Sequence, residues 1–94
     1  MDLDTLAKDP SVPLSVIMFA TRCSKALEIN NFLGGTWNCI YFDYESLTVG
    51  FYRDSKSICI EHNGESLVTI TFEDKNDLWY AVEMIKVLAE QLKD

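Results

Sequence analysis

The stretch TWNCIYFDYESLTVGFYRD, residues 36–54, constrains the fold more than any other part of the chain. It is the densest run of β-branched and aromatic residues, the types that favour strands. Apolar residues occupy odd and even positions alike, so a strand here presents apolar side chains on both of its faces. A sheet built from this run therefore has one face for the core and a second apolar face whose role has to be found.

A helical pattern precedes the strand-rich run. From Leu14 to about Phe32, apolar residues recur at intervals of three and four, which predicts an amphipathic helix. The Gly34-Gly35 pair is expected to end this helix. Residues 1–12 lie upstream of it and are expected to form a loosely ordered N-terminal segment.

A second helix is expected after the strands, from near Asp74 to about Leu92. Acidic residues cluster at its start, where the helix dipole stabilises them. Besides its main apolar stripe it carries a narrower one, made of Tyr80, Met84 and Val87. This second stripe indicates contact with a further helix, which is either the first helix or the same helix of a second copy.

Four strands fit between Thr36 and Phe72. Turns at Glu45-Ser46 and Asp54-Ser55 give a register in which the apolar residues of neighbouring strands fall on one face. That face is the expected core side of the sheet. It holds Ile40, Phe42, Tyr44, Leu47, Val49, Phe51, Ile58, Ile60, Val68, Ile70 and Phe72.

The third turn decides whether the last strand keeps this pattern. A two-residue Asn63-Gly64 loop would set Ile60 opposite Leu67 and turn the last strand over, because a one-residue slip moves every side chain to the other face. A three-residue loop, His62-Asn63-Gly64, with a bulge at its glycine, keeps the faces consistent and is the expected turn. The fold class is therefore α+β, in the order α-β-β-β-β-α, a four-stranded antiparallel meander with the N- and C-terminal helices packed on one face.

The opposite face is a candidate interface. Tyr41 is expected to lie across from Gly50, so its ring can cover a strand position that has no side chain. Aromatic residues with few charges at the centre are what protein interfaces favour. Two alternatives stay open: the first helix covers this face, or the face is an ordinary solvated one. The partner-binding candidates are Trp37, Tyr41 and Tyr52, accompanied by Cys39, Cys59 and Leu67.

Four carboxylates are expected at one end of the sheet. In a meander the first and third turns share an end, which brings Asp43 and Glu45 near Glu61 and Glu65, beside His62. They are either solvated turn residues or a docking edge for Arg and Lys of a basic partner, with mimicry of nucleic-acid phosphates as a special case. The net charge of −7, from fifteen acidic and eight basic residues, favours a basic protein partner and disfavours direct nucleic-acid binding.

No catalytic residue, metal site or cofactor is predicted. His62 is the one histidine, and Cys39 and Cys59 point to the opposite side of the sheet in the expected register, while Cys23 lies on the helix stripe. A Cys–His nucleophile would need the two side chains in contact. A zinc site would need more His or Cys ligands.

These features lead to one expectation and two alternatives. Residues 1–94 are expected to form a single domain, and the odd number of cysteines without a CxxC spacing favours a cytoplasmic location, of a cell or of an infected host. The longest apolar run, PLSVIMFA, is too short to span a bilayer, so no membrane contact is expected. The expected function is that of a non-catalytic inhibitor or regulator of a basic protein, of the antitoxin, immunity or phage anti-defence type. The alternatives are a homo-oligomeric adaptor or chaperone subunit, for instance a homodimer, and a small-molecule-binding domain.

Overall fold

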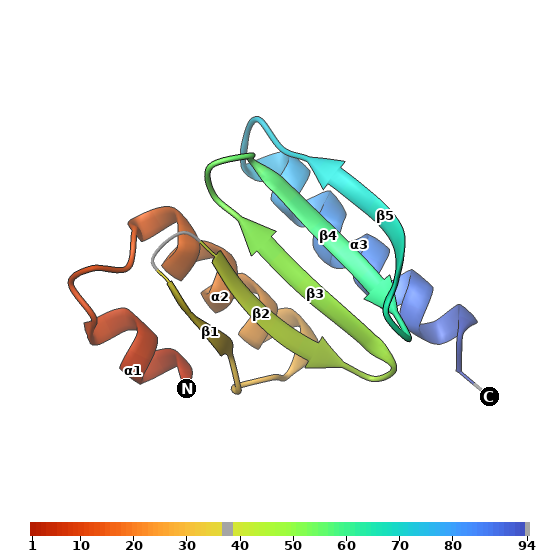
Figure 1. The fold of residues 1–94 in the computed structure, drawn as a ribbon, viewed down its shortest axis with the longest axis horizontal. Coiled ribbons are helices and arrows are strands. Elements are labelled where there is room, and N and C mark those ends of the chain that lie inside the picture. The colour runs from red at the N-terminus through yellow and green to blue at the C-terminus, as the bar shows by residue number, and fades with distance from the viewer. Residues whose placement is uncertain (37–38, 94) are drawn as a thin grey trace.

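The computed structural model of the chain describes residues 1–36 and 39–93 (Figure 1). Its elements are α1 (Leu3–Lys8), α2 (Leu14–Leu27), β1 (Leu33–Thr36), β2 (Cys39–Tyr44), β3 (Leu47–Tyr52), β4 (Ser57–His62), β5 (Glu65–Thr71) and α3 (Lys75–Gln91). The strands form one antiparallel sheet in the order β1-β2-β3-β4-β5. The predicted α+β architecture, a meander between an N-terminal and a C-terminal helix, is confirmed, and β1 and α1 are additions to it.

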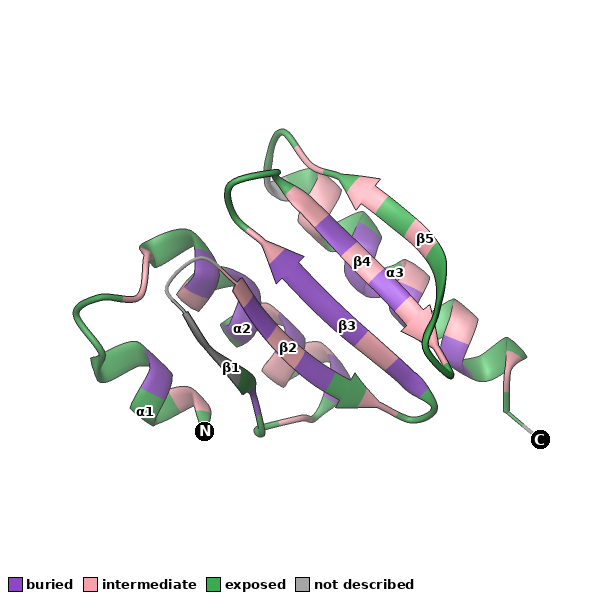
Figure 2. Cartoon of the chain, in the orientation of Figure 1, coloured by how far each residue is buried: buried purple, intermediate pink, exposed green. Residues whose placement is uncertain are grey.

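The predicted pairing of the central strands is also found. Phe42 on β2 lies opposite Val49 on β3, and Val49 lies opposite Ile60 on β4. Side chains of these strands that point to the helices are buried, with Figure 2 showing β3 as the most continuously buried strand. The core residues of the three strands are Ile40, Phe42, Leu47, Val49, Phe51, Ile58 and Ile60.

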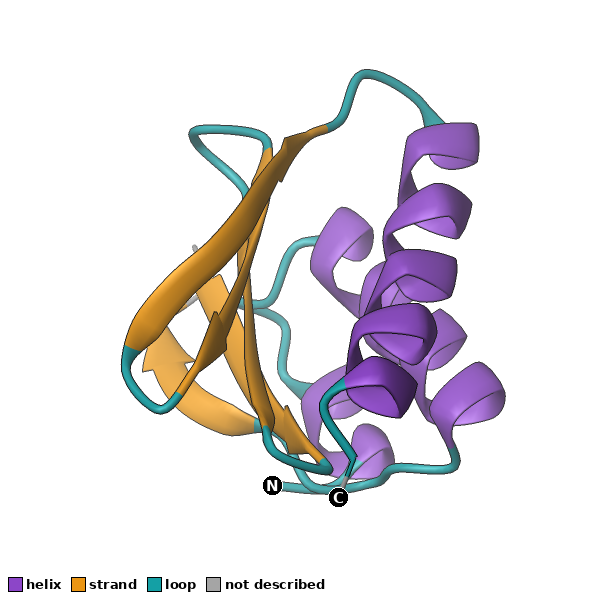
Figure 3. Ribbon diagram, turned by 90° about the vertical axis from the view of Figure 1, so that its right-hand side faces the viewer, coloured by secondary structure: helices purple, strands orange, loops and turns teal. Residues whose placement is uncertain are grey.

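Phenylalanine rings connect the sheet to the helices. Phe51 stacks on Phe19 of α2, with ring centroids 4.6 Å apart, and on Phe72 after β5, with centroids 5.1 Å apart. Offset stacks of this kind add about 0.5–1.5 kcal/mol beyond the area they bury. As Figure 3 shows, α2 and α3 both lie against the same face of the sheet.

The first predicted helix ends earlier than expected. It stops at Leu27, Glu28 adopts a left-handed conformation with φ of 57°, and Gly34-Gly35 lie within β1 and do not end a helix. Phe32 follows Leu27 by five residues, so a continued helix would have turned it about 140° away from the direction of Leu27. Because the helix stops, Phe32 reaches the core, where it is fully buried.

The third turn also differs from the expectation. Asn63 and Gly64 have φ of 53° and 83° and form a two-residue loop, closed by the pair His62 and Glu65. The extra residue sits inside the hairpin, since the register shifts between Ile60, which faces Val68, and its neighbour, which faces Ser66. The bulge therefore lies within β5 and not in the loop. It still turns Val68 and Ile70 toward the core side of the sheet, as the sequence predicts.

The N-terminal segment forms α1, which was not predicted. The Asp2 carboxylate caps the helix by accepting a hydrogen bond from the Thr5 N–H at 2.8 Å, which lowers the pKa of Asp2. Leu6 is buried in the core. The terminal ammonium group donates to the Phe32 carbonyl at 2.6 Å, and so α1 lies beside the start of β1.

Candidate binding surface on the open sheet face

One face of the sheet carries no helix. Figure 3 shows the helices on the other side, and α2 uses its apolar stripe, including Val16, Phe19 and Ala20, in the core. The first helix therefore does not cover the outward face, which was one of the alternatives left by the sequence. No other described segment crosses this face, which we call the open face.

Two tyrosines form the centre of the open face. Tyr41 lies opposite Gly50, as predicted, and its ring meets the Tyr52 ring edge to face, with centroids 5.9 Å apart and an interplanar angle of 83°. A Cβ added to Gly50 would lie 3.1–3.2 Å from ring carbons of both tyrosines. The rings thus rest closely on the bare backbone of β3. We call Tyr41 and Tyr52 the aromatic platform.

The phenol of Tyr41 is held in its neutral form. Its hydrogen bond with the Tyr52 side chain raises the pKa of Tyr41, and the Cys39 thiol, 3.6 Å from the Tyr41 oxygen, adds to the effect. The platform therefore offers two ring surfaces and hydroxyl groups, without a charge of its own.

A row of polar side chains lies beside the platform. Asp43, Thr48, Glu61 and Ser66 face one another across β2 to β5. The Thr48 hydroxyl donates to the Asp43 carboxylate at 3.0 Å, which fixes that carboxylate on the sheet. Among the described side chains of the open face there is no Lys or Arg.

The two turns at this end of the sheet carry the remaining carboxylates. Glu45 lies in the β2–β3 turn and Glu65 starts β5. His62 links the turns, since its Nδ1 lies 3.2 Å from the Ser46 carbonyl oxygen. Together with Asp43 and Glu61, these residues line one end of the sheet, and we call the four carboxylates the acidic rim. In the described part of the chain, these carboxylates included, no group of three potential metal ligands converges.

The other predicted site residues lie elsewhere. Trp37 is outside the described residues. Tyr80, Met84 and Val87 belong to α3, on the helical side of the sheet, so they form a surface separate from the platform. Tyr80 is 56% and Val87 is 49% exposed, whereas Met84 packs partly against the core.

Two features of the surface were not predicted. Leu33 is 45% exposed and lies opposite Tyr41, so β1 extends the open face by an apolar residue. On the helical side, the Arg22 guanidinium carbon lies 3.0 Å from the centre of the Trp79 ring, which joins α2 to α3. The contact of Leu33 with the open face depends on where α2 ends, and the contact of Arg22 with Trp79 depends on how α2 packs on α3. Neither can be read from a local sequence pattern.

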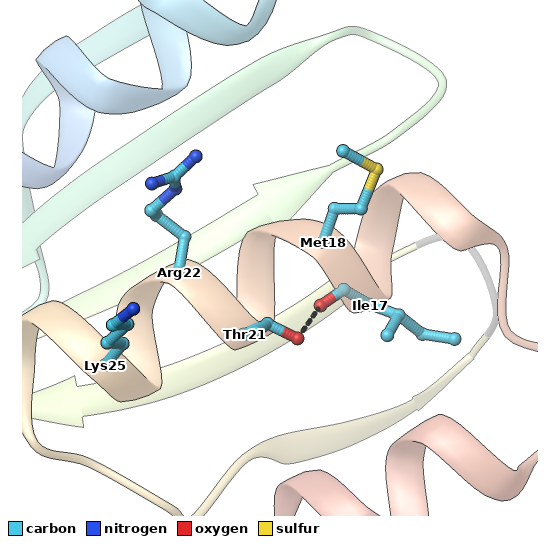
Figure 4. A pocket seen from close by; sticks show the side chains of 5 residues that line it. All are labelled: Ile17, Met18, Thr21, Arg22 and Lys25. Atoms are coloured by element: carbon cyan, nitrogen blue, oxygen red, sulfur yellow. Dashed lines mark hydrogen bonds between the residues drawn. The ribbon is translucent and has the colours of Figure 1, made fainter.

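The outer surface of α2 holds a shallow hollow of about 310 Å³, shown in Figure 4. Its lining residues are Ile17, Met18, Thr21, Arg22 and Lys25. The Thr21 hydroxyl donates to the Ile17 carbonyl at 2.7 Å, so its proton is already engaged within the helix. Two of its side chains, Arg22 and Lys25, are basic, and α2 lies on the helical side of the sheet, opposite the open face.

None of the three cysteines, all within the described residues, forms a disulfide. No helix in the described part of the chain is long and apolar enough to span a membrane. Comparisons of the chain with protein-family models, with curated proteins and with solved structures found no match.

Proposed function

We propose that the chain is a protein-binding module that uses the aromatic platform and the acidic rim to bind a basic partner protein. It would act as a non-catalytic inhibitor or regulator of that partner. One observation carries the proposal: the sheet face without helices holds a packed tyrosine pair together with the carboxylates of Asp43 and Glu61. Rings and carboxylates in this arrangement supply the two kinds of contact that an arginine-rich surface needs.

The platform is suited to binding because its rings are already positioned. Tyrosine is among the residues that contribute most to protein interfaces. Tyr41 and Tyr52 are each in contact with the other and with the backbone of Gly50, so little side-chain freedom remains to be lost on binding. Arginine can stack its guanidinium group on such rings.

The acidic rim supports a basic partner in particular. Charge-assisted hydrogen bonds between guanidinium and carboxylate groups are about twice as strong as neutral ones, and they are often bidentate. Asp43 and Glu61 lie next to the platform, so one arginine could reach a ring and a carboxylate together. The net charge of −7 would also speed the encounter with a positively charged surface.

Covering such a surface is how a small acidic protein can inhibit. A basic protein that uses its positive surface to bind nucleic acid or an acidic substrate loses that surface when this chain occupies it. Antitoxins, immunity proteins and phage anti-defence factors are often of this size and charge, and the comparison with them is an analogy. We place such an encounter in the cytoplasm of a cell or of an infected host.

The proposal can be tested with an arginine-rich peptide as the probe. Titration followed by backbone amide NMR should shift resonances of β2, β3 and β4 on the open face. Glu61→Lys should weaken binding by about tenfold or more, because it reverses a charge beside the platform. Glu90→Lys is the matched control, since Glu90 is an exposed carboxylate on α3 and the change in net charge is the same.

Equal weakening by Glu61→Lys and Glu90→Lys would mean that only total charge matters, and it would overturn the proposed site. The same comparison applies to the rings. Tyr41→Ser should weaken binding strongly, whereas Tyr80→Ser, which removes an exposed tyrosine from α3, should leave it unchanged.

A further inference from the structure

The two edges of the sheet differ in how they are covered. At the β1 edge, the N-terminal residues lie alongside the chain, and the Phe32 N–H donates to the Met1 carbonyl at 2.7 Å. At the β5 edge, which faces the viewer in Figure 3, no described segment lies beyond the strand. The outer side of β5 is therefore an unpaired strand edge.

Burial shows that the core is incompletely closed at this edge. Ile58 and Ile60 of β4 are fully buried, whereas their partners across the ladder on β5, Ile70 and Val68, are only half-buried. Leu88 of α3 is likewise only half-buried. The apolar layer between β5 and α3 is thus partly exposed at Val68, Ile70 and Leu88.

The exposed flank of α3 lies on this same side. Trp79 faces α2 through its contact with Arg22. Leu88 follows Trp79 by nine residues, about 180° around the helix, and Met84 follows it by five, about 140° around. The flank that includes Leu88, Met84 and the exposed Tyr80 therefore points away from α2, toward the side on which β5 ends the sheet.

The backbone of β5 is able to pair with another strand. The Phe72 N–H donates to the Lys56 carbonyl at 2.8 Å, so Phe72 points its backbone groups toward β4. Hydrogen-bonded and non-hydrogen-bonded pairs alternate along an antiparallel ladder. Thr69 and Thr71 therefore direct their N–H and C=O groups outward, away from β4. Natural edge strands are usually protected by charge, proline or a bulge. Between Val68 and Thr71, β5 has none of these, because its bulge lies before Val68.

We propose that a second copy of this chain covers the β5/α3 edge, with the two β5 strands paired antiparallel about a twofold axis. An antiparallel strand edge is complementary to itself under this symmetry. The same rotation brings the α3 flank of each copy toward that of the other, so Tyr80 and Met84 meet apolar surface. A single twofold dimer thus covers both the unpaired backbone of β5 and the half-buried side chains beside it.

Charge favours this edge as the place where two copies meet. Each copy carries a net charge of −7, so contacts between copies are favourable only where charges are sparse. Val68–Thr71, Tyr80, Met84 and Leu88 are all uncharged. Asp77 is the acidic group on this flank, and its carboxylate already accepts hydrogen bonds from the backbone N–H groups of Glu73 and Asp74 at 2.7 and 3.3 Å.

The size of the edge fits a dimer of modest affinity. Both β5 and α3 are roughly 25 Å long, and two layers each about 10 Å thick give a face of roughly 500 Å² per copy. The total of roughly 1,000 Å² is close to the smallest area expected for a specific interface. Dimerisation should therefore be concentration-dependent, with a dissociation constant on the order of micromolar. It is independent of the proposed binding of a basic partner.

Sedimentation velocity from micromolar to millimolar concentration tests the proposal, and the expected result is a reversible monomer–dimer equilibrium. Thr69→Pro removes an outward N–H at an edge position where proline is tolerated, and it should weaken the dimer about tenfold or more. Tyr80→Lys should do the same through the helix flank, and it decides the matter if the proline variant does not fold. Leu33→Lys replaces an exposed apolar residue at the far edge and should leave the equilibrium unchanged.

Hydrogen exchange locates the contact. The amides of Thr69 and Thr71 should gain protection as the protein concentration rises. A monomer at all concentrations, or a dimer that Leu33→Lys weakens as strongly as Tyr80→Lys, would overturn the proposal. So would protection of these amides that appears only when a strand of another protein is added.

Discussion

The ring of Tyr41 lies on the backbone of Gly50, so close that a Cβ on Gly50 would be 3.2 Å from two of the ring carbons. Because the two residues face each other across β2 and β3, the absence of a side chain at one position creates the seat for the ring at the other. The Tyr52 ring is equally close, since the same Cβ would lie 3.1 Å from one of its carbons. The open face is therefore a packed surface and not a set of unrelated exposed residues.

Gly50→Ala should destabilise the protein by about 1 kcal/mol. The methyl group crowds both rings, and overpacking costs roughly 1–3 kcal/mol, whereas replacing a glycine within a strand gains only about 0.5–1 kcal/mol. Denaturant unfolding measures the difference. In a Tyr41→Ala background, two of the three close contacts are gone and the cost should shrink. An equal cost in both backgrounds would contradict the packing described for the platform.

The stack of Arg22 on Trp79 should couple α2 to α3. A double-mutant cycle with Arg22→Ala and Trp79→Leu is expected to give a coupling free energy of about 0.5–1 kcal/mol, since Trp79 is 44% exposed and the contact is not fully desolvated. Lys8→Ala removes an exposed cation of α1 and serves as the control, with no coupling to Trp79→Leu expected. A cycle that closes to zero for Arg22 would show that the stack does not hold the helices.

Much of the fold was predictable because a strand repeats every two residues. The alternation in β2, β3 and β4 sorts Phe42, Val49 and Ile60 to the core, and the same register seats Tyr41 over Gly50. Which residues of these strands lie on the open face follows from the two-residue alternation alone. Contacts that depend on how far a helix extends, such as Leu33 beside Tyr41, do not follow from it.

The errors have local physical causes. Apolar residues continue past Leu27, so periodicity alone did not reveal that the chain leaves the helix before Phe32. The sequence predicts the extra residue in the loop, whereas the structure has it in β5, because one extra residue restores the phase equally well at either position. The Arg22–Trp79 contact joins two helices far apart in the chain, and no local pattern indicates it.

Gly64→Ala should destabilise the hairpin by about 1 kcal/mol through the backbone alone. An added Cβ would meet no atom within 4 Å, so the cost comes from the φ of +83°, which residues with a side chain rarely adopt. Asn63→Gly is the control and should change the free energy of unfolding by less than about 0.5 kcal/mol, since Asn tolerates this conformation. A Gly64→Ala variant as stable as the parent would contradict the two-residue turn.

Cys23 should be inert toward thiol reagents until the protein unfolds. Its side chain is fully buried in the core, and this burial strongly raises the pKa of its thiol. Since the thiolate is the reactive form, modification requires opening of the core, which at a stability of about 5–15 kcal/mol slows the reaction by at least roughly a thousandfold.

Counting modified thiols with and without denaturant measures the effect. Cys23→Ala should lower the count only in denaturant, whereas Cys59→Ala, at a half-exposed position on the open face, should lower it in the native protein. Native modification of Cys23 as fast as that of Cys59 would show that α2 separates readily from the sheet.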